Sequence, residues 1–290
     1  MTGMSSVSPA AGHMSRGRSS SSSSDTTRAV AVVLAAVVAV IGGFLGSGAV
    51  VGTPIDQAAG GALSASATLV APAGPAFSIW SVIYAGLLAL AVYQLLPAQR
   101  HDARQRATGW WVVASLLLNA AWILIAQAGS VTGALVVIVA LLAVLVVAFV
   151  RLTRTGPVTG TATTASRPPV QRVLLDGVIG LYLGWVSIAT VANAAAVLVA
   201  VGGLPVTDPL ATTLAVVVLI VAAGIGWLLA VGGRGRVAPA LSLAWGLVWI
   251  AVGRWSGQPE APVVSVVAVV AALAVMAATL VVRVRHPTND

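Results

Sequence analysis

The chain has 290 residues, of which 59% are hydrophobic and only 8% are charged. Soluble domains average about 25% charged residues, so most of this chain cannot face water. Its positive charge comes from arginines, without any lysine, placed at the ends of apolar runs. That placement indicates membrane topology and argues against nucleic-acid binding. Cysteine is absent, which excludes disulfides and thiolate metal sites.

The first 28 residues are predicted to form a disordered, serine-rich cytoplasmic tail, because residues 19–24 are all serine and no apolar periodicity is present.

Beyond the tail, long apolar stretches alternate with short polar breaks. A helix of about 20 apolar residues spans the hydrocarbon core, where only helices or closed barrels satisfy the backbone. Eight stretches reach or approach that length: 29–51, 75–97, 109–128, 131–150, 173–201, 209–231, 237–253 and 262–282. We therefore predict an all-α, polytopic membrane helix bundle of about eight transmembrane helices.

The arginines support this number of crossings, because cytoplasmic loops carry the excess of arginine. They fall in the tail, in every second break and after the last stretch, and Arg254 alone falls on the other side. We predict that both termini are cytoplasmic and that the chain is a multi-pass protein of the cell (inner or plasma) membrane. The stretch 237–253, which is short and contains Pro239, is the weakest of the eight.

The first stretch has an alternative interpretation as a cleaved signal peptide. Residues 65–67 (ASA) resemble a small-x-small cleavage site. The apolar run is longer than a normal signal core and ends well before that site. A retained membrane anchor is therefore the favoured interpretation.

The sequence contains no recognisable catalytic constellation. His13, His101 and His286 lie outside the apolar stretches, and the motifs of serine hydrolases, zinc proteases and P-loop proteins are absent. The one acid inside a stretch is Asp176, which we interpret as an N-terminal helix residue near Arg172, with a functional acid as the alternative. We expect no enzyme activity, no metal site and no resident cofactor.

Aromatic and amide side chains occur inside the predicted helices at helical spacing. They form three sets: Trp80 and Tyr84; Asn119 and Trp122; and Tyr182, Trp185 and Asn193. Within each set the spacing places the side chains on one helix face. Amides in lipid need partners, and flat aromatic faces suit a planar, mostly apolar ligand. We predict these as ligand-binding residues; the alternative is that they only pack the helices together.

The same positions resemble the signature of the TspO/MBR family, the tryptophan-rich sensory proteins related to the mitochondrial translocator protein. Residues 181–193 (LYLGWVSIATVAN) resemble its fifth-helix pattern P-Y-L-x-W-x-x-x-A-x-x-x-N, with Leu181 in place of the proline. Residues 77–84 (FSIWSVIY) are similar to its second-helix pattern V-F-x-x-x-W-x-x-L-Y, with the Phe-to-Trp gap one residue shorter. Residues 118–122 (LNAAW) resemble its third-helix pattern L-N-x-x-W.

The resemblance implies a five-helix TspO-like unit over 29–202, followed by a three-helix membrane extension with a short basic C-terminus over 203–290. It implies a pocket for a tetrapyrrole, such as porphyrin or haem, or for a sterol-like lipid, held as a ligand. The first loop lacks the tryptophan found in the family, which weakens any inference about a lid.

We therefore expect a receptor, sensor or carrier that contacts the lipid bilayer, binds a hydrophobic small molecule and no nucleic acid, and has a homodimer as its candidate assembly. One alternative is a secondary transporter of a small solute. Another is a structural membrane protein without a ligand, in which Gly180 and Gly184, spaced as G-x-x-x-G, provide a helix contact surface.

Overall fold

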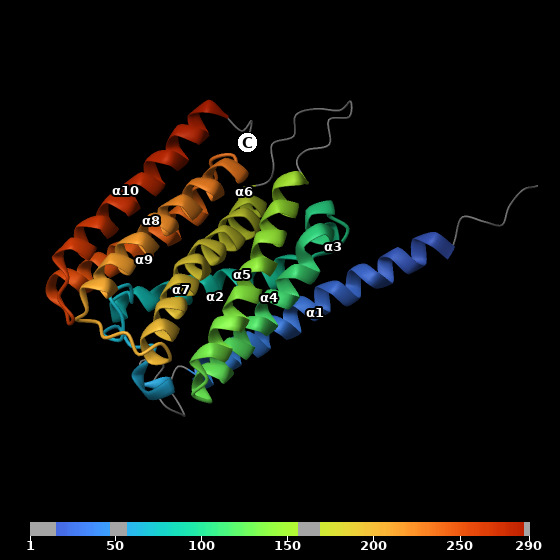
Figure 1. Cartoon of the computed structure of the whole chain (residues 1–290). Helices are drawn as coiled ribbons and strands as arrows, with labels where there is room; N and C mark the ends of the chain where they lie inside the picture. The colour runs from blue at the N-terminus through green and yellow to red at the C-terminus, as the bar shows by residue number, and fades with distance from the viewer. Residues whose placement is uncertain (1–15, 47–56, 156–168, 287–290) are drawn as a thin grey trace, which may run out of the picture.

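The computed structural model describes residues 16–46, 57–155 and 169–286. Within these ranges the chain forms helices without strands (Figure 1). The long helices are α1 (Arg16–Gly46), α2 (Ile79–Tyr93), α4 (Ala103–Gln127), α5 (Val131–Arg154), α7 (Val178–Ala200), α8 (Pro209–Gly232), α9 (Val237–Ser256) and α10 (Pro262–Arg285). Short segments complete them: η1 (Ala58–Gly61), η2 (Gly74–Ser78), α3 (Pro97–Arg100), α6 (Pro169–Gln171) and η3 (Arg172–Gly177).

Over the described residues, 8 helices are long and apolar enough to cross a membrane. Each of the eight predicted stretches overlaps one of them; the end of the first stretch, residues 47–51, lies outside the described residues. Joined to η2, α2 forms a span from Gly74 to Tyr93, and α7 joined to α6 and η3 forms one from Pro169 to Ala200. The prediction of an all-α polytopic helix bundle is confirmed. The orientation of the termini stays a prediction.

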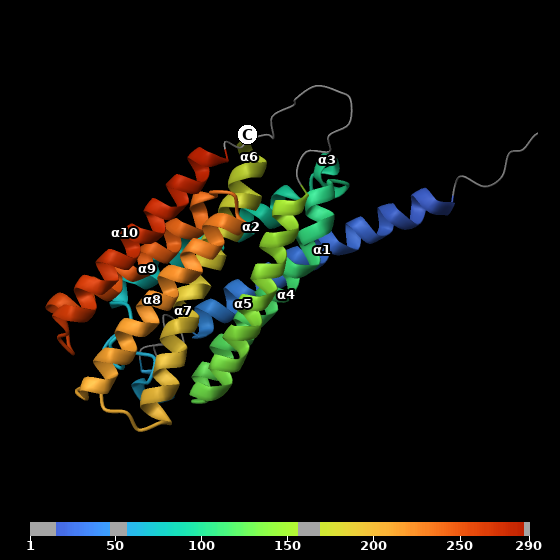
Figure 2. The same ribbon diagram turned by 45° about the horizontal axis from the view of Figure 1, so that its top comes forward.

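The helix α7 lies at the centre of the bundle (Figures 1 and 2). The α4–α5 hairpin packs against one side of α7, and α9 packs against another. On the outer side of the hairpin, α1 packs along α4, and α2 contacts both α1 and α7. The last three helices pack chiefly on one another through α10 and reach α7 mainly through α9. The fifth crossing therefore has neighbours from both ends of the chain.

Two glycines allow α7 and α9 to approach closely. A Cβ at Gly180 would lie 2.8 Å from Ala238 and 2.9 Å from the ring of Pro239. At Gly184 a Cβ would collide with the main-chain oxygen of Pro239 and with the Ser242 hydroxyl. The G-x-x-x-G pair is therefore a contact surface for α9.

The seventh crossing forms a complete helix, although its sequence made it the weakest of the eight. Pro239 lies in the first turn of α9, where the N–H that proline lacks would have no helical acceptor. Its ring faces α7 instead, against Gly180. The proline thus contributes to helix packing without interrupting the helix.

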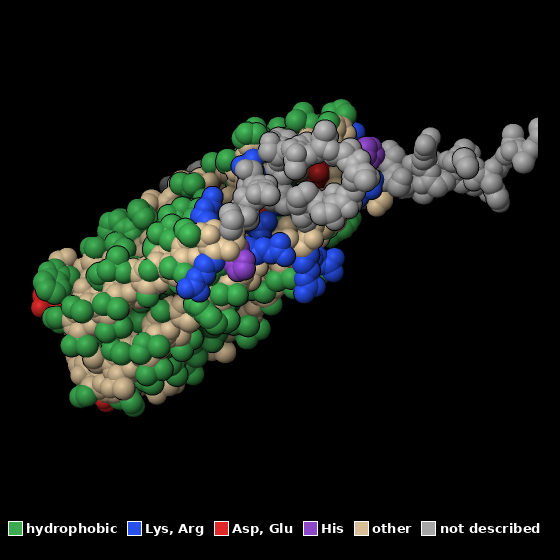
Figure 3. Space-filling model, turned by 90° about the horizontal axis from the view of Figure 1, so that it is seen from above, with side chains coloured by type: hydrophobic (Ala, Val, Ile, Leu, Met, Phe, Trp, Pro, Cys, Tyr) green, Lys and Arg blue, Asp and Glu red, His purple; other side chains and the backbone are tan. Residues whose placement is uncertain are grey.

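One end of the bundle carries most of the arginines, and we call it the arginine-rich end. Figure 3 looks down on it and shows blue arginine side chains gathered between green hydrophobic flanks. The helix α1 begins here at Arg16, so the predicted disordered tail is wrong for residues 16–28; the rest of the tail lies outside the described residues. Asp25 accepts hydrogen bonds from Arg28 at 2.7 Å and from Arg106 of α4. This pairing fixes the added turns of α1 against α4.

Asp176 connects three elements at the same end. Its Oδ1 accepts a hydrogen bond from Arg104 of α4 at 2.6 Å and forms an ion pair with Arg236, just before α9, at 3.0 Å. Because the helical segment starts at Pro169, Asp176 lies beyond its first turn, so the interpretation as an N-terminal helix residue is wrong. The carboxylate instead ties η3, which leads directly into α7, to α4 and to the start of α9.

Candidate ligand-binding site

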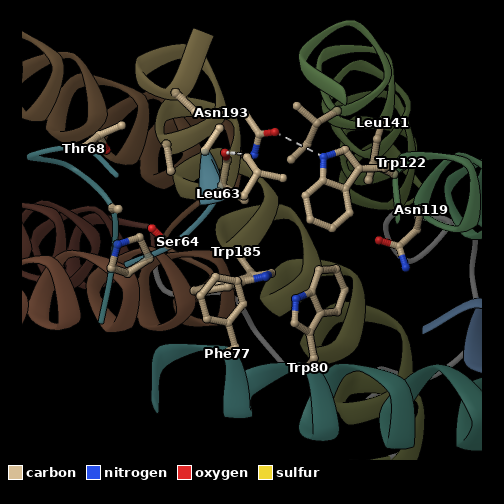
Figure 4. A pocket seen from close by; sticks show the side chains of 17 residues that line it. Leu63, Ser64, Thr68, Phe77, Trp80, Asn119, Trp122, Leu141, Trp185 and Asn193 are labelled. Carbon is tan, nitrogen blue, oxygen red and sulfur yellow. Dashed lines mark hydrogen bonds between the residues drawn. The ribbon is translucent and has the colours of Figure 1, made fainter. Parts of the chain in front are cut away.

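A cavity lies near the end of the bundle opposite the arginine-rich end, among α2, α4, α5 and α7. Residues 57–73, which we call the roof segment, cover it. Its empty volume is about 690 Å³ including its open mouth. The labelled wall residues in Figure 4 are Leu63, Ser64, Thr68, Phe77, Trp80, Asn119, Trp122, Leu141, Trp185 and Asn193. Aromatic and aliphatic side chains thus dominate, with a few polar groups between them.

The structure brings most of the predicted site residues to this one cavity. Those in its wall are Trp80 on α2, Asn119 and Trp122 on α4, and Trp185 and Asn193 on α7. Helical spacing predicted that each set lies on one face of its helix, and in the structure these three faces point toward the same cavity. The side chains therefore meet although the helices are far apart in the sequence.

Three aromatic rings of the cavity wall, those of Phe77, Trp80 and Trp185, lie against one another, and Tyr84 supports them from outside. Trp80 stacks on Tyr84, with ring centroids 5.2 Å apart and planes at 23°. Trp185 meets Trp80 edge-on at 6.3 Å and Phe77 edge-on at 5.7 Å. Stacked and edge-to-face pairs of this kind are favourable aromatic geometries. The wall presents flat, apolar surfaces whose positions are fixed by one another.

The polar groups of the cavity differ in whether they already have hydrogen-bond partners within the protein. Trp122 donates its Nε1–H to the Asn193 Oδ1 at 3.3 Å, and Asn193 donates to the main-chain oxygen of Ala189 at 2.9 Å (Figure 4). In contrast, the Nε1–H of Trp185 is buried and has no hydrogen-bond partner. The Thr68 hydroxyl, also in the lining, is buried without a partner as well. A buried donor without an acceptor is costly, so both groups are free to bond a polar atom of a ligand.

Two predicted residues lie outside the cavity wall. Tyr84 lines an adjoining hollow, whose empty volume is about 600 Å³ including its open mouth, and its hydroxyl accepts a hydrogen bond from Asn119 Nδ2 at 2.7 Å. Tyr182 is only 1% exposed; its ring packs edge-on against Trp80 at 5.9 Å, and its hydroxyl donates to the main-chain oxygen of Ser115 at 3.2 Å. It therefore supports the wall from behind.

The roof segment is a part of the site that was not predicted from the sequence. It contributes Ala62, Leu63, Ser64, Thr68, Ala71 and Pro72 to the lining. The one available signal was the apolar run at residues 69–72 inside a predicted loop, where Leu69 and Val70 are now buried. Buried apolar residues in a loop indicate that the loop covers part of the core.

In the part of the chain that the structure describes, eight apolar helices and an aromatic-walled cavity among four of them define a polytopic membrane protein with a candidate site for a hydrophobic ligand. A family model described as TSPO-like protein matches residues 29–281. The chain belongs to this family, as its second-, third- and fifth-helix motifs predicted. Neither the curated proteins nor the solved structures gave a match. The family match runs through α8, α9 and nearly all of α10, and the predicted division at residue 202 stays a prediction.

Proposed function

We propose that this chain is a membrane receptor, sensor or carrier that binds a hydrophobic, largely planar ligand in the aromatic cavity. The ligand class is the one implied by the family resemblance, a tetrapyrrole such as porphyrin or haem, or a sterol-like lipid. The cell membrane is its proposed location. The observation that carries the proposal is the convergence of aromatic and amide side chains from three helices on one apolar cavity.

The chemistry of the cavity suits such a ligand. The space free for a small molecule is about 50 Å³ in this conformation, below the usual range of about 300–1,000 Å³ for small-molecule sites, so binding of a flat ligand requires the wall or the roof segment to shift. The faces of Trp80 and Trp122 offer stacking surfaces for a flat ring system. The unpartnered indole N–H of Trp185 offers one directional hydrogen bond to an acceptor on the ligand.

The two asparagines have different roles in this proposal. Asn193 already holds the Trp122 indole through its Oδ1, so its main contribution is to orient that ring. Asn119 bonds Tyr84 and lines both the cavity and the adjoining hollow. It is therefore positioned to contact a ligand that extends from one space into the other.

Titration of the purified protein with protoporphyrin IX, followed by tryptophan fluorescence, tests the proposal. We compare Trp185→Leu with Trp227→Leu, because Trp227 on α8 is 54% exposed and lies away from the cavity. We expect saturable binding by the unaltered chain and by Trp227→Leu. Trp185→Leu should bind about tenfold more weakly or worse, which corresponds to about 1.4 kcal/mol. Substitution of Trp122 and Trp185 together by leucine should abolish binding and leave the fold intact.

Binding that never saturates, in a protein with an intact fold, would reject the proposal. A sterol is then titrated in the same way. Saturable binding of the sterol alone would indicate a cavity selective for lipids, whereas absence of binding would show that the cavity takes neither ligand. Uptake of a small solute into liposomes driven by a proton or sodium gradient would then favour a transporter. Absence of both binding and uptake would favour a structural role.

A further inference from the structure

The roof segment is bonded to α9 by a buried arginine. Arg254 lies in the last turn of α9 and is 1% exposed. Its Nη2 donates to the main-chain oxygen of Ala65 at 2.7 Å, and its Nη1 donates to that of Thr68 at 3.2 Å. Thr68 lines the aromatic cavity. A cation of the seventh crossing therefore holds part of the wall of a cavity formed by earlier helices.

Two further bonds join α9 to the chain that leads from the roof segment into α2. The N–H of Ala73 donates to the main-chain oxygen of Trp249 at 3.1 Å. The indole Nε1–H of Trp245 donates to the main-chain oxygen of Ala76 at 2.9 Å. These bonds fix the end of the roof segment, whereas the bonds from Arg254 fix its middle.

The burial of Arg254 depends on the position of the roof segment. Among the described residues Arg254 forms no ion pair; its acceptors are main-chain oxygens, the third being that of Gln258 at 3.4 Å. A buried guanidinium without a carboxylate is costly, and hydrogen bonds to carbonyls offset that cost. If the roof moved away, two of those acceptors would leave with it. The favourable state of Arg254 and the covered state of the cavity are therefore coupled.

A second hollow on the far side of the roof segment leaves it room to move. This hollow has an empty volume of about 960 Å³ including its open mouth, and Arg254, Gly253 and Ser66 are among its lining residues. Leu63 and Ser64 line both this hollow and the aromatic cavity. This part of the roof is therefore a thin partition between two spaces, and the bonds from Arg254 to Ala65 and Thr68 hold the chain directly after it.

We propose that Arg254 is a positioning residue of the ligand site, and that α9 thereby sets how fast a ligand enters and leaves the aromatic cavity. This inference rests on the proposed function, because it takes that cavity as the site of binding. It gives the membrane extension a role in the site, that of holding the cover in place. Loss of the bonds from Arg254 should raise the population of the open roof by about tenfold or more, given the usual strength of charged hydrogen bonds.

The first experiment compares Arg254→Met, which keeps an apolar chain of similar reach but no donors, with Arg254→Lys, which keeps the charge and one donor group. Hydrogen exchange of residues 62–72 is measured without any ligand, and residues of α5 serve as the internal control. Dissociation of protoporphyrin IX is measured by stopped flow on the same proteins. We expect exchange and dissociation to be about tenfold faster in Arg254→Met, with Arg254→Lys between it and the unaltered chain.

A disulfide provides a matched rescue. An added Cβ at Gly253 would lie 3.5 Å from the Cβ of Ala73, which is within the range of a disulfide, and the chain contains no other cysteine. In the Arg254→Met background, the oxidised pair Ala73→Cys and Gly253→Cys should restore slow exchange and slow dissociation. Reduction should remove the rescue. If Arg254→Met does not fold, the same pair in the chain with Arg254 intact should slow dissociation when it is oxidised.

Each outcome has a definite meaning. Unchanged exchange of residues 62–72 in folded Arg254→Met overturns the proposal, with or without a ligand. Faster exchange with unchanged dissociation also overturns it, because the roof then does not control the ligand. Weaker binding that the disulfide fails to restore assigns Arg254 to direct contact with the ligand and rejects a positioning role. If the unaltered chain binds no porphyrin, the proposed function fails before any variant is compared.

Discussion

Replacement of Gly184 by alanine tests the contact between α7 and α9 on which the arrangement of the bundle depends. The added methyl group would meet the main-chain oxygen of Pro239, which cannot rotate away, and the Ser242 hydroxyl. The two helices must then separate or shift. Overpacking of this kind usually costs about 1–3 kcal/mol, and the upper part of that range is expected because a backbone atom obstructs the methyl group.

The matched control is Gly224→Ala on α8, where an added Cβ has no neighbour within 4 Å. Both changes replace a helical glycine by alanine, which gains up to about 1 kcal/mol of helix propensity. Thermal unfolding in one detergent should therefore show Gly224→Ala unchanged or stabilised. Gly184→Ala should unfold roughly 5–10 °C lower than the unaltered chain. Equal stability of the two variants would refute the close approach at Gly184 and weaken the argument that α9 holds the roof segment.

Two further predictions concern buried polar partners. Asp176→Asn leaves two arginines without their carboxylate and should destabilise the protein by on the order of 3 kcal/mol, whereas Asp208→Asn should be nearly neutral, because asparagine also caps a helix. Equal losses in unfolding experiments on the two variants would contradict the ion-pair assignment. In a double-mutant cycle, Tyr84→Phe and Asn119→Leu should show a coupling of about 0.5–1.5 kcal/mol, because each removes the same hydrogen bond. Strictly additive effects would show that this bond contributes no stability.

The crossings, and the aromatic and amide side chains that the helices bring to the cavity, were predictable because both depend on local sequence. The length of an apolar run determines whether a helix can span the hydrocarbon core, and helical periodicity determines which side chains share a face. The spacing from Tyr182 to Asn193 therefore predicted a common direction for that face. It could not predict that Tyr182 would lie behind the wall while Trp185 lies in it, because burial depends on the neighbouring helices.

Contacts between distant segments were not predictable from the spacing of residues along the chain. The pairing of Asp176 with Arg236 and the bonds from Arg254 to the roof segment join residues far apart in the sequence. In the sequence, Arg254 stood out only as the one arginine predicted to lie on the side of the membrane opposite the others. Its role depends on the carbonyl groups that surround it, and no residue type in the sequence indicates where carbonyl groups will gather.

The central position of α7 has a consequence for how the protein is made. The chain is synthesised from its N-terminus, so α7 enters the membrane before α9 has been translated. During that interval the surface formed by Gly180 and Gly184 faces lipid or the insertion machinery, and its close helix partner does not yet exist. A nascent chain ending near residue 202 would already hold every residue that lines the cavity, yet it would lack the helix that fixes α7 in place. Completion of the site therefore waits for the seventh crossing, and maturation is a late event in biosynthesis.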